Sequence, residues 1–431
     1  MKKMKKGNDK MLNPNTGERE LAYVVKIDSI EPIPGRDRVE CAKVGGWTIM
    51  VRKDQFKPGD LGIYFEIDSK VPAKEPFMFL EGKHFKIKTQ KYKTPNGQFW
   101  SQGLLMGAED FNGTLEQDAF GELQIILKIN NNYKVFHEKD FLTKELGVTY
   151  ADPEDNKRKS KSSVDKYQKM AQRMGKKFAK QPYRWLMKHK LGRKILYLFF
   201  GNNKKDNAKS WPDGKFPGVA RTDQERVENM TWILRDKTPF IVTQKCDGSS
   251  GTYILERKGK NKFEFYVCSR NVRMASKEQE CFYGSHNYYW EVAEKYDIEN
   301  KMKAWLNSVP GRDWVCWQGE ICAPGIQKNP HNLSETHFYC FHWTDNVNGR
   351  RDIRDAIVDW KSYNMETVPI VCDNYIMPDD FEEFKKSADG YYMEEVCEGH
   401  TNCKREGFVY YKTTEPTFSF KNVSREYLLN H

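Results

Sequence analysis

Short strand-like segments separated by Gly and Pro turns are the feature that most constrains the fold of this chain. Between residues 19 and 128, the segments at 21–30, 39–44, 47–52 and 61–67 are separated by Pro34-Gly35, Gly45-Gly46 and Pro58-Gly59-Asp60. Strands of this length, with turns at this spacing, favour a small β-barrel or sandwich. We predict a five-stranded barrel of the OB type here.

The second half of the chain mixes strand and helix patterns. Strands are predicted near residues 238–244, 251–257, 262–269, 313–321, 336–343 and 406–412, and helices at 222–230, 285–308 and 379–387. The prediction is an α+β chain in three parts. These are an OB-like β-barrel domain at 19–128, a linker at 129–213 with a basic helical insertion at 157–194, and a domain of antiparallel sheets with flanking helices at 214–431.

Composition limits the environment of the protein. The chain has 431 residues, of which 38% are hydrophobic and 30% are charged, and no stretch approaches the roughly 20 apolar residues that span a bilayer. Its ten cysteines are spread as single residues, which is typical of buried thiols in a reducing compartment and not of a disulfide framework. We therefore expect a soluble, cytoplasmic protein that is not inserted in a membrane, and we expect a monomer.

The net charge of +11 is concentrated in one segment. Residues 157–194 hold fifteen Lys or Arg and one acid, Asp165, which gives +14 there and leaves −3 for the rest of the chain. Such a segment suits nucleic acid, because neutralising phosphates releases counterions. The alternatives are a solvated or disordered lysine-rich insertion and a membrane-surface helix. The candidate nucleic-acid contacts are Lys157, Arg158, Lys176, Lys177, Arg184, Arg193 and Lys194.

The tetrapeptide Lys245-Cys246-Asp247-Gly248 follows the apolar strand pattern at 240–243. A lysine at the end of a strand, entering a Gly-Ser turn, is placed like a covalent nucleophile, although a solvated lysine in a β-turn is the alternative. A free lysine has a pKa of about 10.4, so the neutral amine costs roughly 4.6 kcal/mol at pH 7. Burial, positive neighbours or a metal must supply this, and we expect charged residues to converge on Lys245.

Further polar residues follow later strand patterns. Arg270 ends one strand and can hold a phosphate, and Glu320 ends another, where it can bind a ribose hydroxyl or a metal. The strand at 337–342 offers an aromatic face for a base. Glu406 stands before Gly407 in the same design, and Lys421 is a late lysine for phosphate. Each residue has an ordinary structural explanation when taken singly.

The order of these residues resembles the covalent nucleotidyltransferase superfamily of ATP-dependent ligases and capping guanylyltransferases, with its K-x-D-G and E-G-x-V motifs. Residues 214–431 most resemble nick-sealing RNA ligases that carry an N-terminal OB domain. The match is carried by Phe216-Pro217, Thr222-Asp223-Gln224-Glu225-Arg226-Val227, Gln318-Gly319-Glu320-Ile321, Pro324-Gly325-Ile326-Gln327 and Phe418-Ser419-Phe420-Lys421. In the first domain it is carried by Ile33-Pro34-Gly35, Asp37-Arg38-Val39-Glu40, Tyr64-Phe65-Glu66-Ile67-Asp68 and Ser101-Gln102-Gly103-Leu104.

The resemblance implies an ATP-dependent RNA ligase that joins 3′-hydroxyl and 5′-phosphate ends, at nicks in RNA or RNA/DNA duplexes, through lysyl-AMP. The implied catalytic residues are Lys245, Asp247, Glu320, Glu406 and Lys421, and the implied nucleotide-binding residues are Arg226, Gly248, Arg270, Phe341 and, as second choice for stacking on adenine, Phe338. Glu320 and Glu406 would hold Mg²⁺ or Mn²⁺, which offsets the charge of the triphosphate.

Two alternatives to this function and one possible zinc site stay open. Ser419 stands where the superfamily commonly has a first lysine, and His342 stands where many relatives have aspartate, so an inactive nucleic-acid-binding relative is one alternative. A DNA ligase or capping enzyme is another, although only ten residues follow Lys421 where those enzymes generally have an OB domain. Cys397, His400 and Cys403 have a spacing that can bind zinc, but a fourth ligand is not obvious.

Overall fold

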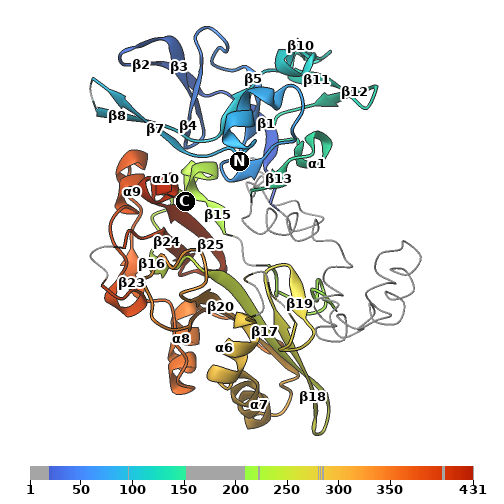
Figure 1. Ribbon diagram of the computed structural model, residues 1–431, viewed down its shortest axis with the longest axis vertical. Helices are drawn as coiled ribbons and strands as arrows, with labels where there is room; N and C mark the ends of the chain where they lie inside the picture. Colours follow the sequence, from blue (N-terminus) through green and yellow to red (C-terminus); the bar gives the residue numbers. More distant parts are fainter. Residues whose placement is uncertain are drawn as a thin grey trace, which may run out of the picture.

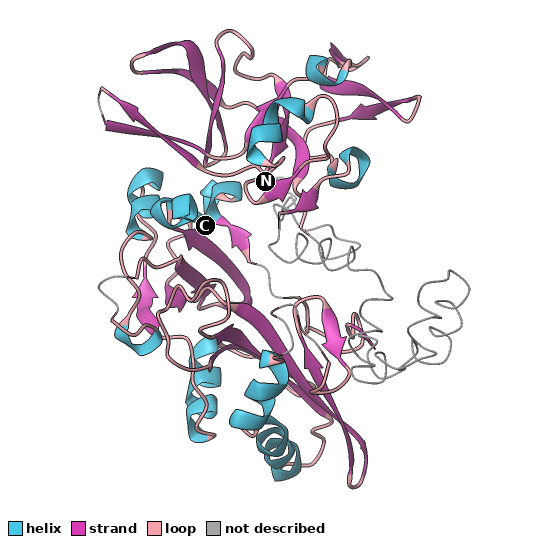
Figure 2. Ribbon diagram, in the orientation of Figure 1, coloured by secondary structure: helices cyan, strands magenta, loops and turns pink. Residues whose placement is uncertain are grey.

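The computed structural model describes residues 19–95, 97–151, 209–221, 224–279, 281, 283, 286–399 and 403–430. These residues form two domains, the N-terminal one at the top of Figure 1 and the C-terminal one below it. Strands make up the centre of each domain, and most helices lie at the edges (Figure 2). The chain is α+β, as its sequence predicts.

The N-terminal domain is built from short antiparallel strands. They are β1 (Ala22–Lys26), β2 (Ser29–Ile33), β3 (Arg36–Val44), β4 (Trp47–Arg52), β5 (Leu61–Phe65), β6 (Ser69–Lys70), β7 (Gln90–Thr94), β8 (Gly97–Ser101) and β9 (Leu104–Met106). Two three-stranded sheets, in the orders β1-β5-β9 and β2-β3-β4, carry its core. In β4, Trp47, Ile49 and Val51 are buried and alternate with less buried residues, as a half-buried strand requires.

Residues 114–150 also belong to this domain. They form β10 (Thr114–Gln117), β11 (Leu123–Ile129), β12 (Asn132–Phe136), α1 (Thr143–Leu146) and β13 (Thr149–Tyr150). Ile125, Leu127 and Leu146 lie in the same hydrophobic cluster as Phe65, and β13 pairs with β6. The segment 129–150, which the sequence places in the linker, therefore packs on the N-terminal domain.

Two antiparallel sheets dominate the C-terminal domain. The seven-stranded sheet has the order β14 (Lys209–Ser210), β19 (Val272–Met274), β18 (Lys262–Cys268), β17 (Ser249–Gly259), β20 (Trp314–Cys322), β21 (His337–Asp345) and β22 (Gly349–Arg350). The five-stranded sheet has the order β15 (Glu225–Arg226), β25 (Glu415–Val423), β24 (Gly407–Lys412), β16 (Phe240–Lys245) and β23 (Ile370–Tyr375), with β15 and β25 parallel.

The remaining helices are short. They are α6 (Tyr288–Lys295), α7 (Ile298–Ser308), α8 (Ile353–Ser362), α9 (Phe381–Ser387) and α10 (Arg425–Asn430). Helices α6, α7 and α8 bury Val292, Trp305 and Trp360 in one cluster with the strand residues Trp317 and Trp343. The predicted helix at 379–387 is confirmed as α9.

Two helix predictions need correction. The single helix expected at 285–308 is two helices, because Asp297 takes a left-handed backbone conformation (φ 49°) between α6 and α7. The helix expected at 222–230 is wrong for its described part. The segment forms strand β15 and then two 3₁₀ turns, η4 (Val227–Asn229) and η5 (Thr231–Arg235). Pairing of β15 with β25 outweighs the local helix propensity.

One asparagine connects the two domains. Asn229 accepts hydrogen bonds from Trp47 Nε1 (2.6 Å) and the Tyr23 hydroxyl (3.3 Å), and it donates to Glu66 Oε1 (3.0 Å) and Glu225 Oε1 (2.8 Å). The first three partners belong to the N-terminal domain. A polar node with this many partners fixes how the domains sit on each other.

The described helices are each too short or too polar to cross a bilayer. All ten cysteines are free thiols, and eight of them are buried. This state agrees with the expectation of buried thiols in place of a disulfide framework.

Candidate active site

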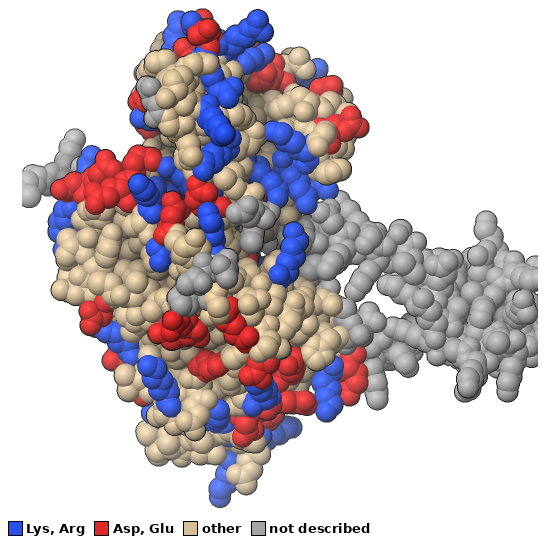
Figure 3. Space-filling view, turned by 60° about the vertical axis from the view of Figure 1, so that its left-hand side comes forward, with Lys and Arg blue, Asp and Glu red and all other residues tan. Residues whose placement is uncertain are grey.

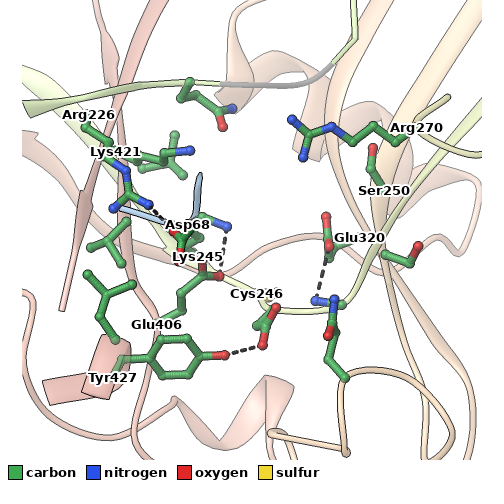
Figure 4. A pocket seen from close by; sticks show the side chains of 18 of the residues that line it. Asp68, Arg226, Lys245, Cys246, Ser250, Arg270, Glu320, Glu406, Lys421 and Tyr427 are labelled. Atoms are coloured by element: carbon green, nitrogen blue, oxygen red, sulfur yellow. Dashed lines mark hydrogen bonds and ion pairs between the residues drawn. The ribbon is translucent and has the colours of Figure 1, made fainter. Parts of the chain in front are cut away.

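A pocket of about 390 Å³ opens where the two C-terminal sheets meet the N-terminal domain (Figure 4). Nine of the ten residues predicted for catalysis or nucleotide binding line it. They are Arg226, Lys245, Asp247, Gly248, Arg270, Glu320, Phe341, Glu406 and Lys421. These residues come from both sheets and span almost 200 positions of the chain, so the fold brings together what the sequence keeps apart.

Strand pairing sets the position of Lys245. This residue ends β16 and pairs with Gly407 at the start of β24, which places Glu406 beside it. The Nζ atom of Lys245 lies 2.8 Å from Glu406 Oε2. Gly407 has φ 143°, and a Cβ atom there would lie 2.1 Å from the Asn422 carbonyl oxygen, so the position requires glycine. Gly407 therefore permits the close backbone approach, and Glu406 before it forms the ion pair with Lys245.

The pKa of Lys245 is raised in the protein without nucleotide or metal. Burial lowers this pKa, but the carboxylates of Glu406, Glu320 and Asp247 together outweigh the effect. The predicted convergence of charge on Lys245 is present. The protein groups of this site do not make the amine neutral, because those nearest to it are anions.

The turn after Lys245 is held by three side chains. The Asp247 backbone N–H donates to His331 Nε2 (3.0 Å), and the Gly248 N–H donates to Glu320 Oε1 (3.1 Å). The hydroxyl of Tyr427, from α10, donates to Asp247 Oδ2. A Cβ atom at Gly248 would lie 2.3 Å from the Ile321 carbonyl oxygen, so this close approach also requires glycine.

His331 is the neutral support of that turn. Its other ring nitrogen, Nδ1, lies 2.7 Å from the Val396 carbonyl oxygen, which leaves Nε2 as the acceptor for Asp247. The side chain is fully buried, and burial lowers its pKa to about 4. The imidazole is therefore uncharged at neutral pH.

The carboxyl groups of the pocket have raised pKa values. Burial, followed by the charge of Glu406, raises the pKa of Asp247 to about 7, although Tyr427 and Lys245 oppose the shift. Burial also raises the pKa of Glu320 to about 8, with Lys245 opposing and Glu406 and Asp247 adding to the effect. A cation bound among carboxyl groups this close together would stabilise their ionised forms.

The donor set fits a hard divalent cation that also binds phosphate oxygens. Glu320 and Glu406 supply carboxylate oxygens from opposite sheets. Within the described residues no group of three or more His, Cys, Asp or Glu side chains is arranged to hold a metal by itself. Mg²⁺ is usually bound by one or two carboxylates together with substrate phosphates and water, so this donor set suits it.

Phe341 lines the pocket, whereas Phe338 does not. In the pairing of β20 with β21, Gln318 faces His342 and Gly319 faces Cys340, which leaves Phe341 as an extra residue in a β-bulge. The bulge directs Phe341 into the pocket. Phe338 is fully buried and packs edge-on against Tyr253 at 5.1 Å between ring centroids, so its predicted role as a second stacking residue needs correction.

Cationic side chains flank the carboxylates. Arg226 and Lys421 are paired on the parallel strands β15 and β25, and Arg270 stands across the pocket from them (Figure 4). Arg226 forms an ion pair with Asp68 of the N-terminal domain (2.9 Å). Its buried Nε and Nη1 atoms have no hydrogen-bond partner among the described residues. Ser419 lies outside the pocket lining, on the same strand as Lys421.

Sequence reasoning missed the contribution of the N-terminal domain. Asp68, Lys86, Lys88 and Tyr150 line the pocket, and the Arg270 guanidinium lies 5.5 Å from the centroid of the Tyr150 ring. Asp68 ends one of the motifs on which the family resemblance depends, and that signal could have assigned it to the site. Nothing in the local sequence of Tyr150 or Tyr427 indicates a role.

Two groups of predicted residues fall outside the described part of the chain. The basic candidates between Lys157 and Lys194 are one group, and His400 of the possible zinc site is the other. Of the described cysteines in that zinc motif, Cys397 is buried, and burial followed by its interaction with Cys403 raises its pKa to about 12. These predictions stay untested.

Comparison with known proteins agrees with the site. Residues 238–424 match the sequence model of the RNA ligase family, and residues 21–107 match that of an OB-fold domain. Among curated proteins no sequence matches significantly. Structures of Naegleria gruberi RNA ligase, one of a variant with ATP and Mn and one with PPi, each have 24% sequence identity and a TM-score of 0.65, and cover 96% of this chain and 99% of theirs.

At this identity the structural match shows the shared fold, which confirms the predicted OB-like domain followed by a sheet-rich domain. The family match confirms the resemblance stated from the motifs. An OB-fold domain is thus followed by a domain whose residues 238–424 match the RNA ligase family, and the chain resembles enzymes of the RNA ligase type.

Proposed function

We propose that the protein is an ATP-dependent ligase that joins RNA 3′-hydroxyl and 5′-phosphate ends through an adenylylated Lys245. One observation carries the proposal: the Lys245 amine meets the carboxyl groups of Asp247, Glu320 and Glu406 and the cations of Arg226, Arg270 and Lys421 in one pocket, with Phe341 at its wall. Structures of N. gruberi RNA ligase with ATP and Mn, with AMP and Mn, and with PPi support ATP as the substrate and pyrophosphate as a product.

The first step is attack of the Lys245 amine on the α-phosphorus of ATP. A P–N bond forms, the bond from the α-phosphorus to the bridging oxygen breaks, and pyrophosphate leaves with the electron pair of that bond. The proton that Nζ must lose has a nearby acceptor in Glu406, at 2.8 Å. Arg226, Arg270 and Lys421 are suited to hold the phosphates, and Phe341 to stack on the base.

A divalent cation, Mg²⁺ or Mn²⁺, would be held by Glu320 and Glu406 together with phosphate oxygens. When bound, it would neutralise charge on the triphosphate and lower the pKa of the adjacent lysine. The protein's own part is to place Lys245 between these carboxylates and to hold the turn after it through His331, Glu320 and Tyr427.

The later steps transfer AMP from Lys245 to a 5′-phosphate and then seal the strand. In the second step the P–N bond breaks and a pyrophosphate linkage forms at the RNA 5′ end. In the third step a 3′-hydroxyl oxygen attacks that 5′-phosphate, AMP leaves and the hydroxyl proton is released. We propose a nicked duplex, with RNA or RNA and DNA strands, as the substrate, and a monomer as the active form.

The ordered set of chemical steps supplies the test. Incubation with α-labelled ATP and Mg²⁺ or Mn²⁺ should label the protein, and addition of nicked RNA should move the label to the 5′ end and then release it as AMP. The Lys245→Ala variant should do neither, but it should still seal a substrate that already carries AMP at its 5′ end. Labelling of Lys245→Ala at the wild-type level would refute the proposal.

One observation favours a second function, that of an inactive nucleic-acid-binding protein. Ser419 leaves β25 without the first of the two cations common in the superfamily, as expected for a nucleic-acid-binding relative without activity. Tight RNA binding with no labelling under either metal would favour that alternative. A DNA ligase or capping enzyme would be favoured by sealing of an all-DNA nick or by transfer of GMP to an RNA 5′ end.

A further inference from the structure

A lysine-rich part of the N-terminal domain borders the pocket. Residues 82–108 contain five lysines, at positions 83, 86, 88, 91 and 93, and neither Asp nor Glu. Ile87 and Thr89 are buried, whereas Lys86 is half-buried and Lys88 is exposed, so these two lysines project to the side away from the domain core. Both line the active-site pocket.

The hairpin of β7 and β8 extends this basic surface away from the pocket. The guanidinium of Arg36 lies 4.9 Å from the ring centroid of Tyr92, which is stacked on Phe99. The turn that carries Arg36 touches the hairpin tip, since a Cβ atom at Gly35 would lie 2.9 Å from the Pro95 side chain. The Tyr92 ring therefore holds Arg36 against the hairpin that also carries the exposed Lys93.

Helix α10 joins the hairpin to the pocket. Lys91 Nζ lies 4.8 Å from the Trp100 ring centroid and 2.6 Å from Glu426 Oε1. The next two residues of α10, Tyr427 and Leu428, line the pocket. Figure 3 shows Lys and Arg side chains gathered on the N-terminal domain above its boundary with the C-terminal domain. This ion pair and helix α10 thus connect the hairpin to the pocket.

We infer that this surface, formed by Lys86, Lys88, Lys93 and Arg36, binds the phosphate backbone of the RNA strand whose end enters the pocket. The inference rests on the proposed function and specifies which part of the N-terminal domain meets the substrate. A row of cations without interspersed acids in the segment 82–108 complements a polyanion, and its continuity with the pocket places that polyanion where strand ends must meet Lys245.

The test measures RNA affinity against salt for the full-length protein. The Arg36→Ala/Lys93→Ala variant removes two exposed cations that lie outside the pocket lining. The matched control, Lys260→Ala/Lys262→Ala, removes the same charge from the exposed β17–β18 turn, at the opposite end of the molecule in Figure 1. Binding of a nicked RNA duplex labelled with a fluorophore is followed by anisotropy between about 50 and 200 mM salt.

If both cations contact phosphates, the slope of log affinity against log salt falls in magnitude by about 1.5, which is roughly an eightfold smaller loss of affinity across that fourfold salt range. The control keeps the wild-type slope, and Arg36→Lys/Lys93→Arg, which keeps both charges, restores it. An Arg36→Ala/Lys93→Ala slope equal to that of the control would overturn the inference.

Self-adenylylation without RNA separates the two proposals. Failure of the wild-type protein to form lysyl-AMP would count against the proposed function, whatever the salt dependence. Normal labelling of the Arg36→Ala/Lys93→Ala variant together with an unchanged salt slope would count against the RNA surface alone.

Discussion

The Nζ atom of Lys245 lies 2.8 Å from Glu406 Oε2, and this contact joins the end of β16 to the loop before β24. Burial by itself would favour a neutral amine, yet the carboxylates around Lys245 raise its pKa. The Lys245 amine is therefore protonated in the protein without ligands. Neutralisation of these carboxylates by a cation would favour the reactive amine, which links metal dependence to the geometry of this ion pair.

The Glu406→Gln substitution should lower the pKa of Lys245. It removes the nearest anion, while burial, which favours the neutral amine, remains. The measurement is the pH dependence of acetylation of Lys245 by acetic anhydride in metal-free protein, followed by peptide mass spectrometry. Asp379→Asn, which removes an exposed carboxylate from an ion pair elsewhere, should leave the profile unchanged. A wild-type profile in Glu406→Gln would contradict this assignment.

The Glu320→Gln substitution should make the metal-free protein more stable at alkaline pH. The pKa of Glu320 is raised to about 8, so the unfolded state loses this proton first as pH rises, and wild-type stability falls between its ordinary pKa and about pH 8. Glutamine keeps the acceptor for the Gly248 N–H without the charge. The Tm difference between variant and wild type should therefore grow as pH is raised from about 4.5 to 8.5. A difference that stays constant would exclude the ionisation of Glu320 as its cause.

The Tyr427→Phe substitution should move the acidic limb of the adenylylation rate to higher pH. The hydroxyl donates to Asp247 and holds the pKa of that carboxyl, about 7, below what burial and Glu406 would otherwise make it. Loss of a hydrogen bond to a charged group should reduce the rate roughly tenfold between about pH 6 and 7, and less above that range. Tyr391→Phe, at a half-exposed tyrosine, is the control. A uniform loss of rate at every pH would indicate a structural effect.

The Asn229→Ala substitution should destabilise the contact between the domains. It removes the acceptor that now lies 2.6 Å from the buried Trp47 Nε1, and it removes one of the donors to Glu225 Oε1, at 2.8 Å. We expect a loss of about 2–4 kcal/mol in the free energy of unfolding, measured by urea denaturation. Asn307→Ala, at a surface asparagine that contacts Arg257, should cost much less. Equal losses in the two variants would argue against Asn229 as the connecting residue.

Much of the site was predictable because its residues end strands whose apolar patterns can be recognised in the sequence. Lys245 and Glu320 follow apolar runs, and Gly407 and Gly248 occupy positions where a Cβ atom would collide with backbone. Helix α8 was also within reach, since Ile353, Ala356, Ile357 and Trp360 recur at helical spacing after the N-cap Asp352, but that pattern was missed.

Other features depend on long-range contacts that local patterns do not contain. The β-bulge that separates Phe341 from Phe338 follows from pairing with β20, a strand twenty residues away. Tyr427 and Asp68 reach the pocket from the last helix and the first domain, and only the folded chain places them there. Strand β15 replaces a predicted helix for the same reason: its partner, β25, lies almost 200 residues later.

The most direct test of the central claim is to locate the AMP adduct. The wild-type protein is incubated with ATP and Mg²⁺ or Mn²⁺, digested under mildly alkaline conditions that preserve a phosphoramide, and mapped by mass spectrometry. We expect one AMP group on the peptide that contains Lys245, lost on mild acid treatment and absent from Lys245→Ala. An adduct on another residue, or a Lys245 peptide without AMP while nicked RNA is being sealed, would contradict it.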